Sequence, residues 1–235
     1  MPRIVQAAAK NRLLEALPAA VRTRLLARAE RVPLAWGSVL VASNERIRWV
    51  YFPTAGAVSL ISPVTGHAGL EVARVGDEGM LGLTMVLGGT STPERALVQA
   101  SGTAWRLEAG MFRREVARSP PLRRVLDRYI ELRLREFGLM AVCAHFHELD
   151  ARFARWLLIA GDQLHRDDFY MTQESLSAVL GVRRASVNRV ASSLQQRKLI
   201  RYRRGEITLL DRGGLESAAC ECYAVLKANY AARLG

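Results

Sequence analysis

Residues 172–209 contain the pattern that most restricts how this chain can fold. Thr172 can cap a helix over the stretch QESLSAVL, and Gly181 can provide the turn that follows. The next stretch, RRASVNRVASSLQQRK, predicts a second helix with four apolar residues on its inner face: Val187, Val190, Ala191 and Leu194. The stretch LIRYRRGEITLLD then predicts a two-stranded hairpin with Gly205 in its turn. A helix, a turn, a helix and a hairpin in this order are typical of a winged helix-turn-helix domain.

The charge of the same segment favours a nucleic-acid partner. Residues 181–204 hold eight basic side chains and no acidic one, within a chain of net charge +12. Because 31 of the 34 basic residues are arginine, a GC-rich genome can account for part of the total, so the local distribution is the stronger indication. Most basic helices are only solvated surfaces. Here the basic helix stands within a helix-turn-helix pattern, so we favour a DNA-binding surface. The negatively charged phosphate backbone of DNA attracts such a basic surface.

The exposed N-terminal part of the second helix is where helix-turn-helix domains meet base edges in the major groove. The tip of the hairpin suits contacts to phosphate. The predicted DNA-binding residues are Thr172, Arg183, Arg184, Ser186, Asn188, Arg189, Arg203 and Arg204.

The first half of the chain has a different residue pattern, in which short apolar runs alternate with turn residues. A predicted helix over residues 11–29 precedes four apolar runs with turn residues between them, which predict short strands and an all-β sandwich or roll: VPLAWGSVLVAS, WVYFPTAGAVSLIS, LEVARVGDEG and ALVQASGTAWRLEAG. After Pro120 and Pro121, plausible first-turn residues, apolar side chains recur at helical spacing up to Met140. This helix is too apolar to stand alone, so we expect a partner helix, for example from a second subunit. A further helix, ELDARFARWLLIAGDQL, ends in a polar connector, HRDD.

Residues 171–216 resemble the C-terminal winged helix-turn-helix domain of the Crp/Fnr superfamily of bacterial transcription regulators. The stretches YFPTAGAVSLIS and VGDEGMLG resemble strands of its cyclic-nucleotide-binding-like β-roll, and residues 116–145 resemble its dimerisation helix. The resemblance implies an α+β fold with a sensor β-roll in 1–115, a dimerisation helix in 116–145 and a DNA-binding domain in 146–235. It implies a homodimer that binds double-stranded DNA and, if it is an activator, RNA polymerase.

The resemblance also assigns roles to residues of the second helix. Arg184 and Arg189 match the family's base-reading arginine pair, and Ala185 stands where many members have glutamate. Loss of that acceptor, which suits cytosine, predicts a different preferred DNA site. Arg183 replaces the usual serine cap, so the first amides of the helix are less well satisfied, and a phosphate can take that role.

The sensor pocket departs from the family pattern. Members that bind cyclic AMP use a glycine-glutamate-leucine-glycine turn for the ribose and an arginine followed by serine for the phosphate. The matching residues here are Gly79, Met80, Leu81 and Gly82, followed by Arg95 and Ala96. Met80 cannot accept a hydrogen bond from a ribose hydroxyl, and Ala96 cannot donate one to phosphate. We therefore expect that the protein binds neither cyclic AMP nor a cofactor. Arg95 could still attract another nucleotide or a different anionic effector. The alternative is that Arg95 only pairs with a surface acid such as Glu94.

Other chemistry is not expected. Cys220 and Cys222 lie two apart on a predicted helix and point to different sides, so we expect structural thiols, no metal and no disulfide framework. The cluster-binding sensors of the superfamily use four cysteines, whereas this chain has three, none near its start. His145 and His147 are interpreted as surface or interface residues. No nucleophile, base and orienting acid come together in the pattern, so we expect no enzyme and no catalytic residue.

The combined interpretation is a homodimeric, sequence-specific DNA-binding transcription regulator with an altered effector pocket. The alternative is a ligand-binding or protein-interaction module without specific DNA recognition. The sequence has no apolar run long enough for a membrane span, and its first residues carry charges where a signal peptide needs apolar ones, so we expect a cytoplasmic protein with no membrane partner.

Overall fold

The computed structural model describes residues 10–66 and 69–234. Two short helices, α1 (Arg12–Glu15) and α2 (Ala19–Leu26), open the described chain. The prediction of one helix over residues 11–29 is wrong, because Pro18 cannot continue α1 and instead stands at the N-terminal cap of α2. Asn11 accepts a hydrogen bond from the Leu14 amide and donates to the carbonyl oxygens of Pro53 and Gly79, which ties α1 to the strands that follow.

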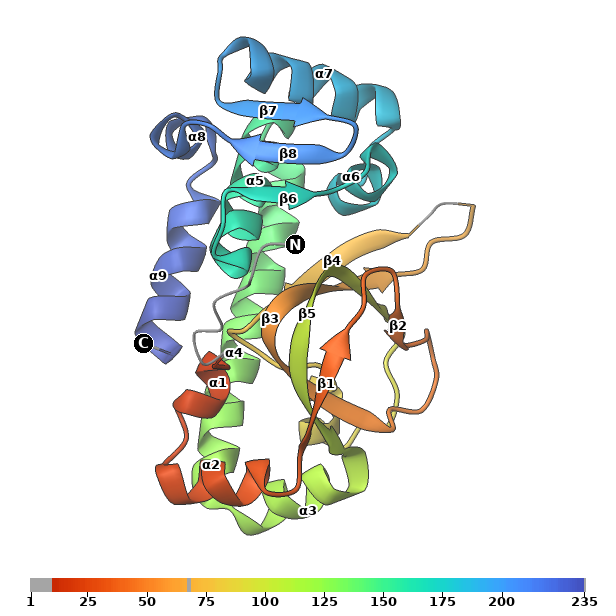
Figure 1. Ribbon diagram of the computed structural model, residues 1–235, viewed down its shortest axis with the longest axis vertical. Coiled ribbons are helices and arrows are strands. Elements are labelled where there is room, and N and C mark those ends of the chain that lie inside the picture. Colours follow the sequence, from red (N-terminus) through yellow and green to blue (C-terminus); the bar gives the residue numbers. More distant parts are fainter. Residues whose placement is uncertain (1–9, 67–68, 235) are drawn as a thin grey trace, which may run out of the picture.

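The strands of the first half form one antiparallel sheet that curls into a roll (Figure 1). Its order is β1-β5-β3-β4, and β2 also pairs with β5. The strands are β1 (Glu30–Leu34), β2 (Val39–Val41), β3 (Trp49–Ser62), β4 (Leu70–Val75) and β5 (Arg95–Glu108). The predicted strand runs overlap all of these strands, although β1 begins two residues before its run, at Glu30, and β5 begins one residue before its run, at Arg95. A short 3-10 helix, η1 (Leu83–Leu87), lies between β4 and β5.

The long pairing of β3 with β5 changes register near its middle, and glycine allows this. Gly56 has φ of +81°, and a Cβ at Gly102 would lie 2.0 Å from the Ala55 carbonyl oxygen. A side chain cannot fit where the two backbones come this close. The irregular register bends both strands, so that the sheet wraps around the core of the roll.

Two helices follow the roll: α3 (Ala109–Arg118) and α4 (Pro120–Phe146). The sequence analysis did not anticipate α3, whose first amides, of Gly110 and Met111, donate to the Glu108 carboxylate. Pro120 and Pro121 lie in the first turn of α4, as predicted. The inner face of α4 packs against the roll, and α9 (Cys222–Leu234) runs beside α4 (Figure 1). None of the described helices is both long and apolar enough to cross a membrane.

The C-terminal part has its own core, built from α5, α6, α7 and the strands beside them. Its elements are α5 (Leu149–Leu164), β6 (Asp168–Tyr170), α6 (Gln173–Leu180), α7 (Arg184–Gln196), β7 (Ile200–Arg203), β8 (Glu206–Leu209) and α8 (Arg212–Ala218). The predicted two-stranded hairpin is a three-stranded sheet in the order β6-β8-β7. The last residue of the stretch interpreted as a polar connector, Asp168, is instead the first residue of β6, because Phe169 pairs with Ile207 of β8 and is buried in the core of this part.

Contacts between β4 and α5 fix the roll against the C-terminal part. The Arg74 guanidinium lies 4.5 Å from the centre of the Trp156 ring, and the Trp156 indole nitrogen donates to the Glu71 carboxylate at 3.1 Å. Arg74 and Glu71 both come from β4, whereas α7 lies at the end of the molecule away from the roll (Figure 1). Within residues 10–66 and 69–234, the outward face of α7 is therefore left uncovered.

Candidate nucleic-acid interface

The turn between α6 and α7 forms as the sequence predicts. The Thr172 hydroxyl accepts a hydrogen bond from the Ser175 amide at 3.0 Å and caps α6. Gly181 ends α6 with φ of +66°, a conformation that glycine adopts without strain. The Val182 amide then donates to the Ser177 carbonyl oxygen, which closes the turn and sets the direction of α7.

The inner face of α7 holds it against α5 and α6. Val187, Val190, Ala191 and Leu194 are all buried, as their spacing predicts. Burial of each such side chain contributes about 1.5–3 kcal/mol for the larger aliphatic residues, so the orientation of α7 about its own axis is well determined. The residues between them must consequently face solvent.

The outward face of α7 carries the predicted contact residues. Arg183, Arg184, Asn188 and Arg189 are exposed, and Ser186 is half-buried. The Arg189 guanidinium lies 3.5 Å from the Asp150 carboxylate, but its side chain is 66% exposed. An ion pair this exposed and this long is worth well under about 1 kcal/mol, so Arg189 can exchange it for another acceptor at little cost.

Asn188 has a partner within the domain. Its side-chain carbonyl oxygen accepts a hydrogen bond from the Gln173 amide group at the start of α6. The two amides thus bridge the outer ends of α6 and α7, and Gln173 is a residue that the sequence analysis did not select. Its position directly after the Thr172 cap was the available signal, since the first turn of α6 faces the first half of α7.

The N-terminus of α7 has no side-chain cap. Arg183 stands at the cap position and makes no capping hydrogen bond, as predicted from the absence of serine. The first amides of a helix attract anions because of the helix dipole and their free N–H groups. With Arg183 and Arg184 beside them, these amides form a site suited to a phosphate group.

The wing is the turn between β7 and β8. Arg204 and Gly205 both have positive φ, 52° and 88°, which is the conformation of a tight two-residue hairpin turn. Arg203 and Arg204 are exposed at this tip. Burial raises the pKa of the Tyr202 phenol, which therefore stays protonated and donates to the Met171 carbonyl oxygen at 3.2 Å. This hydrogen bond fixes the wing beside α6.

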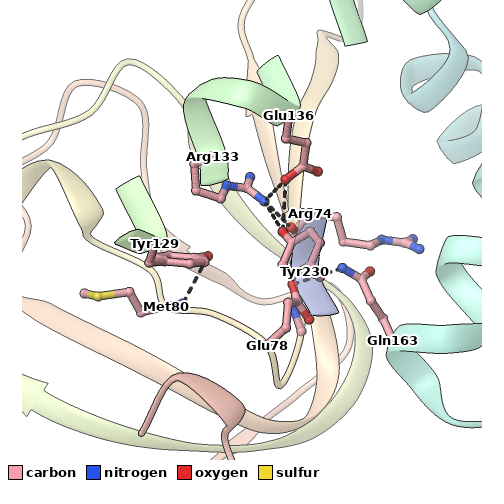
Figure 2. Close-up of polar contacts among 9 residues, drawn as sticks. Arg74, Glu78, Met80, Tyr129, Arg133, Glu136, Gln163 and Tyr230 are labelled. Atoms are coloured by element: carbon pink, nitrogen blue, oxygen red, sulfur yellow. Dashed lines mark hydrogen bonds and ion pairs between the residues drawn. The ribbon is translucent and has the colours of Figure 1, made fainter. Parts of the chain in front are cut away.

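The predicted effector residues lie in the core of the roll. Met80 is 2% exposed and Ala96 is 1% exposed, and both belong to the main hydrophobic cluster. The Tyr129 hydroxyl of α4 accepts a hydrogen bond from the Met80 amide at 3.3 Å (Figure 2). A Cβ at Gly79 would lie 2.0 Å from the same hydroxyl oxygen, so α4 closes directly over this turn.

The two halves of the predicted pocket pair with different parts of β3. Leu81 pairs with Tyr51, whereas Ala96 pairs with Leu60, nine positions further along β3. Arg95 is half-buried at the start of β5, and no hydrogen bond or ion pair of the described residues involves its guanidinium. Tyr129 was missed by the sequence analysis because its role depends on α4 packing against a turn that precedes it by almost fifty residues.

The prediction that Cys220 and Cys222 point to different sides of one helix is wrong. Cys220 lies in the break between α8 and α9, and only Cys222 is helical. Both thiols face Cys143 and His147 at the C-terminal end of α4, and the four side chains form one cluster. The available signal was the spacing of four between Cys143 and His147, which places both on one side of a helix. His145 is exposed and meets the Phe146 ring edge to face, so its interpretation as a surface residue agrees with the structure.

Comparisons with known proteins agree with this geometry. Residues 151–218 match the family model of the Crp-like helix-turn-helix domain. No curated protein matches the sequence.

Solved structures match over most of the chain. A protein described as a transcriptional regulator of the Crp/Fnr family from Eubacterium rectale superposes with a TM-score of 0.70 at 18% identity, covering 88% of this chain and 96% of its own. FixK2 from Bradyrhizobium japonicum superposes with a TM-score of 0.70 at 17% sequence identity, covering 82% of this chain and 98% of its own. The c-di-GMP responsive regulator CLP from Xanthomonas campestris superposes with a TM-score of 0.69 at 16% sequence identity, covering 83% of this chain and 100% of its own.

At these identities the likeness of the solved structures shows the fold, while the family model identifies the domain that holds α6, α7 and the wing. The resemblance of the sequence to the superfamily is thereby confirmed. The chain contains a Crp-like helix-turn-helix domain, and it has the fold of the Crp/Fnr superfamily of transcription regulators.

Proposed function

We propose that the protein is a homodimeric, sequence-specific DNA-binding transcription regulator. The observation that carries the proposal is the outward face of α7, where Arg184 and Arg189 are exposed beside an arginine-tipped wing. In this proposal residues 1–115 form the sensor domain, 116–145 the dimerisation helix and 146–235 the DNA-binding domain. The protein would act on DNA in the cytoplasm, without catalysis and, if it is an activator, together with RNA polymerase.

The exposed side chains of α7 suit direct reading of bases. Arginine bonds guanine through two parallel hydrogen bonds in the major groove, and Arg184 and Arg189 have the exposed, planar donors that this requires, Arg189 after giving up its weak pair with Asp150. Arg203 and Arg204 at the wing tip suit the adjacent phosphates, which orient the domain but carry no sequence information. The α7 arginines would therefore supply specificity, and the wing mainly affinity.

A second copy of the chain is the partner that fits the uncovered face of α4. Four residues spaced by four, three and four positions lie along this face and are exposed or only half-buried: Ile130, Leu134, Phe137 and Ala141. Such spacing is typical of the seam of a two-stranded coiled coil, in which the same stripe of two identical helices packs together. The inner face of α4 and part of Ile130 pack on the roll, whereas Leu134, Phe137 and Ala141 are exposed among the described residues and offer a surface to a partner helix.

The experiment that tests the proposal is selection of random DNA fragments by the purified protein, followed by sequencing. A dimer of helix-turn-helix domains should enrich a rough palindrome whose half-site centres lie about 34 Å, or one helical turn, apart. Enrichment of no motif over input would favour the alternative function, a ligand-binding or protein-interaction module. The segment 181–204, which has eight basic residues and no acidic one, disfavours that alternative. A ligand-binding or protein-interaction module does not require such a basic surface.

We also infer that cyclic AMP is not the effector. The side chain of Met80 is buried in the core, and the Tyr129 hydroxyl lies against Gly79, where the family pattern addresses a ribose. Loss of one buried hydrogen-bonding partner costs about 1–3 kcal/mol, so loss of two contacts weakens binding by at least about a hundredfold. Arg95 remains suited to a different anionic ligand, such as a larger nucleotide.

Calorimetric titration of the nucleotide-free protein with cyclic AMP checks this inference, with DNA binding measured in parallel. We expect no saturable heat at micromolar nucleotide and no change in DNA affinity. Saturable binding that also tightens the DNA complex would show that other contacts replace the lost ones, and the inference would be withdrawn.

A further inference from the structure

Four side chains of metal-ligating type meet where α4 ends and α9 begins. Cys143 lies in the last turn of α4 and His147 directly follows that helix, while Cys220 precedes α9 and Cys222 is its first residue. Their ligand atoms all lie within 4.8 Å of one another. The Cys143 and Cys220 sulfurs are 3.5 Å apart, and the Cys222 sulfur is 3.5 Å from Nδ1 of His147. The three thiols are buried, and the His147 side chain is 20% exposed.

These separations fit a single tetrahedral ion. Zinc binds thiolate sulfur at about 2.3 Å and imidazole nitrogen at about 2.0–2.1 Å, and three cysteines with one histidine are a known structural ligand set. A tetrahedral centre with these bond lengths separates two sulfurs by about 3.8 Å and a sulfur from a nitrogen by about 3.5 Å. An iron–sulfur cluster places several atoms between its ligands and needs a wider arrangement than four ligand atoms within 4.8 Å.

The surroundings of the cluster support metal binding independently. Nε2 of His147 lies 3.0 Å from the Glu221 carboxylate, which leaves Nδ1 facing the thiols. Metal-ligating histidines commonly donate their other ring N–H to a carboxylate, which fixes the tautomer and the ring orientation. Glu221 stands between the two cysteine ligands in the sequence, so the same short turn supplies two ligands and this orienting partner.

A nearby cation offsets the charge of the occupied site. Three thiolates, one neutral imidazole and one Zn²⁺ carry a net charge of −1. The Arg155 guanidinium of α5 lies near the thiols, and its Nε is buried without a hydrogen-bond partner among the described residues. A buried donor without a partner is costly, and thiolates on a metal would supply negative charge beside it.

We propose that Cys143, His147, Cys220 and Cys222 bind one Zn²⁺ ion per chain. On binding, the three thiols lose their protons to the solvent and the four ligand atoms bond to the ion. Because His147 lies between α4 and α5, the ion fastens the start of α9 to the point where the long helix passes into the C-terminal part. The proposal does not depend on DNA binding.

The test is metal binding by the full-length protein after removal of metal under reducing conditions. Titration with Co²⁺ should give a thiolate-to-cobalt charge-transfer band and the strong visible bands of tetrahedral cobalt, saturating at one ion per chain. Zn²⁺ should then abolish these bands, because zinc binds such ligands more tightly than cobalt. Octahedral cobalt spectra, or saturation at no defined stoichiometry, would overturn the proposal.

Matched variants separate ligands from neighbours. The H147A variant should lose tetrahedral cobalt binding, whereas H145A, two residues away, should bind like the wild type. Glu221→Gln should retain one ion but bind it about 10–100-fold more weakly. Circular dichroism checks that each variant folds. Equal zinc affinity in H147A, H145A and wild type would overturn the proposal, as would a disulfide between Cys143 and Cys220 that persists when Zn²⁺ is supplied with reductant.

Discussion

Replacing Leu134 with glutamate is expected to convert the proposed dimer to a monomer and to weaken binding to the selected operator by about 10²–10⁴-fold. Leu134 is 65% exposed in the middle of the α4 stripe, so the monomer should tolerate the change. Two copies of the stripe would place two carboxylates in one apolar seam, which is costly without a partner charge. Separate monomers lose the gain in affinity that comes from linking two binding sites. Sedimentation and fluorescence anisotropy with labelled operator measure the two effects.

Leu87→Glu is the matched control for this prediction. Leu87 is 66% exposed but lies on η1 rather than on the stripe, and the substitution changes charge and size in the same way. It should leave both the dimer and the operator affinity unchanged. A wild-type protein that sediments as a monomer together with its DNA would contradict the dimer.

Replacing Arg133 with methionine is expected to destabilise the folded chain by about 3–5 kcal/mol. Nη1 of Arg133 donates to the Glu136 carboxylate at 2.7 Å, to the Tyr230 hydroxyl at 3.2 Å and to the Arg74 carbonyl oxygen at 3.3 Å (Figure 2). The Arg133 side chain is only 4% exposed. Removing one partner of a buried ion pair leaves the other charge without compensation, which accounts for the size of the effect.

The nearby buried Glu78 carboxyl group is a second group whose charge depends on Arg133. Burial raises the pKa of Glu78, and the positive charge of Arg133 acts in the opposite direction. Its oxygen Oε1 accepts from the Gly76 amide and from Gln163 of α5 (Figure 2). Arg133 therefore joins groups from the roll, α4 and α9, and its loss should loosen the packing between them.

Urea unfolding of Arg133→Met and Arg135→Met measures this effect with an internal control. Arg135 lies on the same helix, but its side chain is 53% exposed and pairs with Glu131 at the surface. Exposed pairs of this kind contribute about 0.2–1 kcal/mol, so Arg135→Met should unfold nearly like the wild type. Equal losses in the two variants would show that the buried network does not stabilise the fold.

The elements that the sequence predicts well are those encoded by neighbouring residues. The cap at Thr172, the turn at Gly181 and the buried stripe of α7 involve residues within about two helical turns of each other, and all three form as expected. The strand runs were also recognisable, since β3 occupies the whole of the stretch 49–62. Local patterns of capping, turns and apolar spacing decide such elements.

The features that the sequence analysis missed depend on contacts between distant residues. Strand β6 exists because β8, almost forty residues later, pairs with it. The thiol cluster joins Cys143 to Cys220, 77 positions away, and the wrong assumption of an unbroken helix hid it. The closure of Tyr129 over Gly79 likewise follows from how α4 packs on the roll. No single-segment pattern contains this information, because tertiary packing determines it.

Base reading by α7 is tested most directly by one comparison of DNA affinities. Affinities of wild type, Arg184→Ala and Arg128→Ala are measured on the selected operator and on random DNA at one salt concentration. An arginine bonded to guanine contributes about 1–3 kcal/mol of discrimination, so Arg184→Ala should lose that amount per half-site on the operator and much less on random DNA. Arg128, an exposed arginine of α4, should affect neither. A loss by the same factor on both DNAs would show that Arg184 touches only the backbone and would contradict base reading by α7.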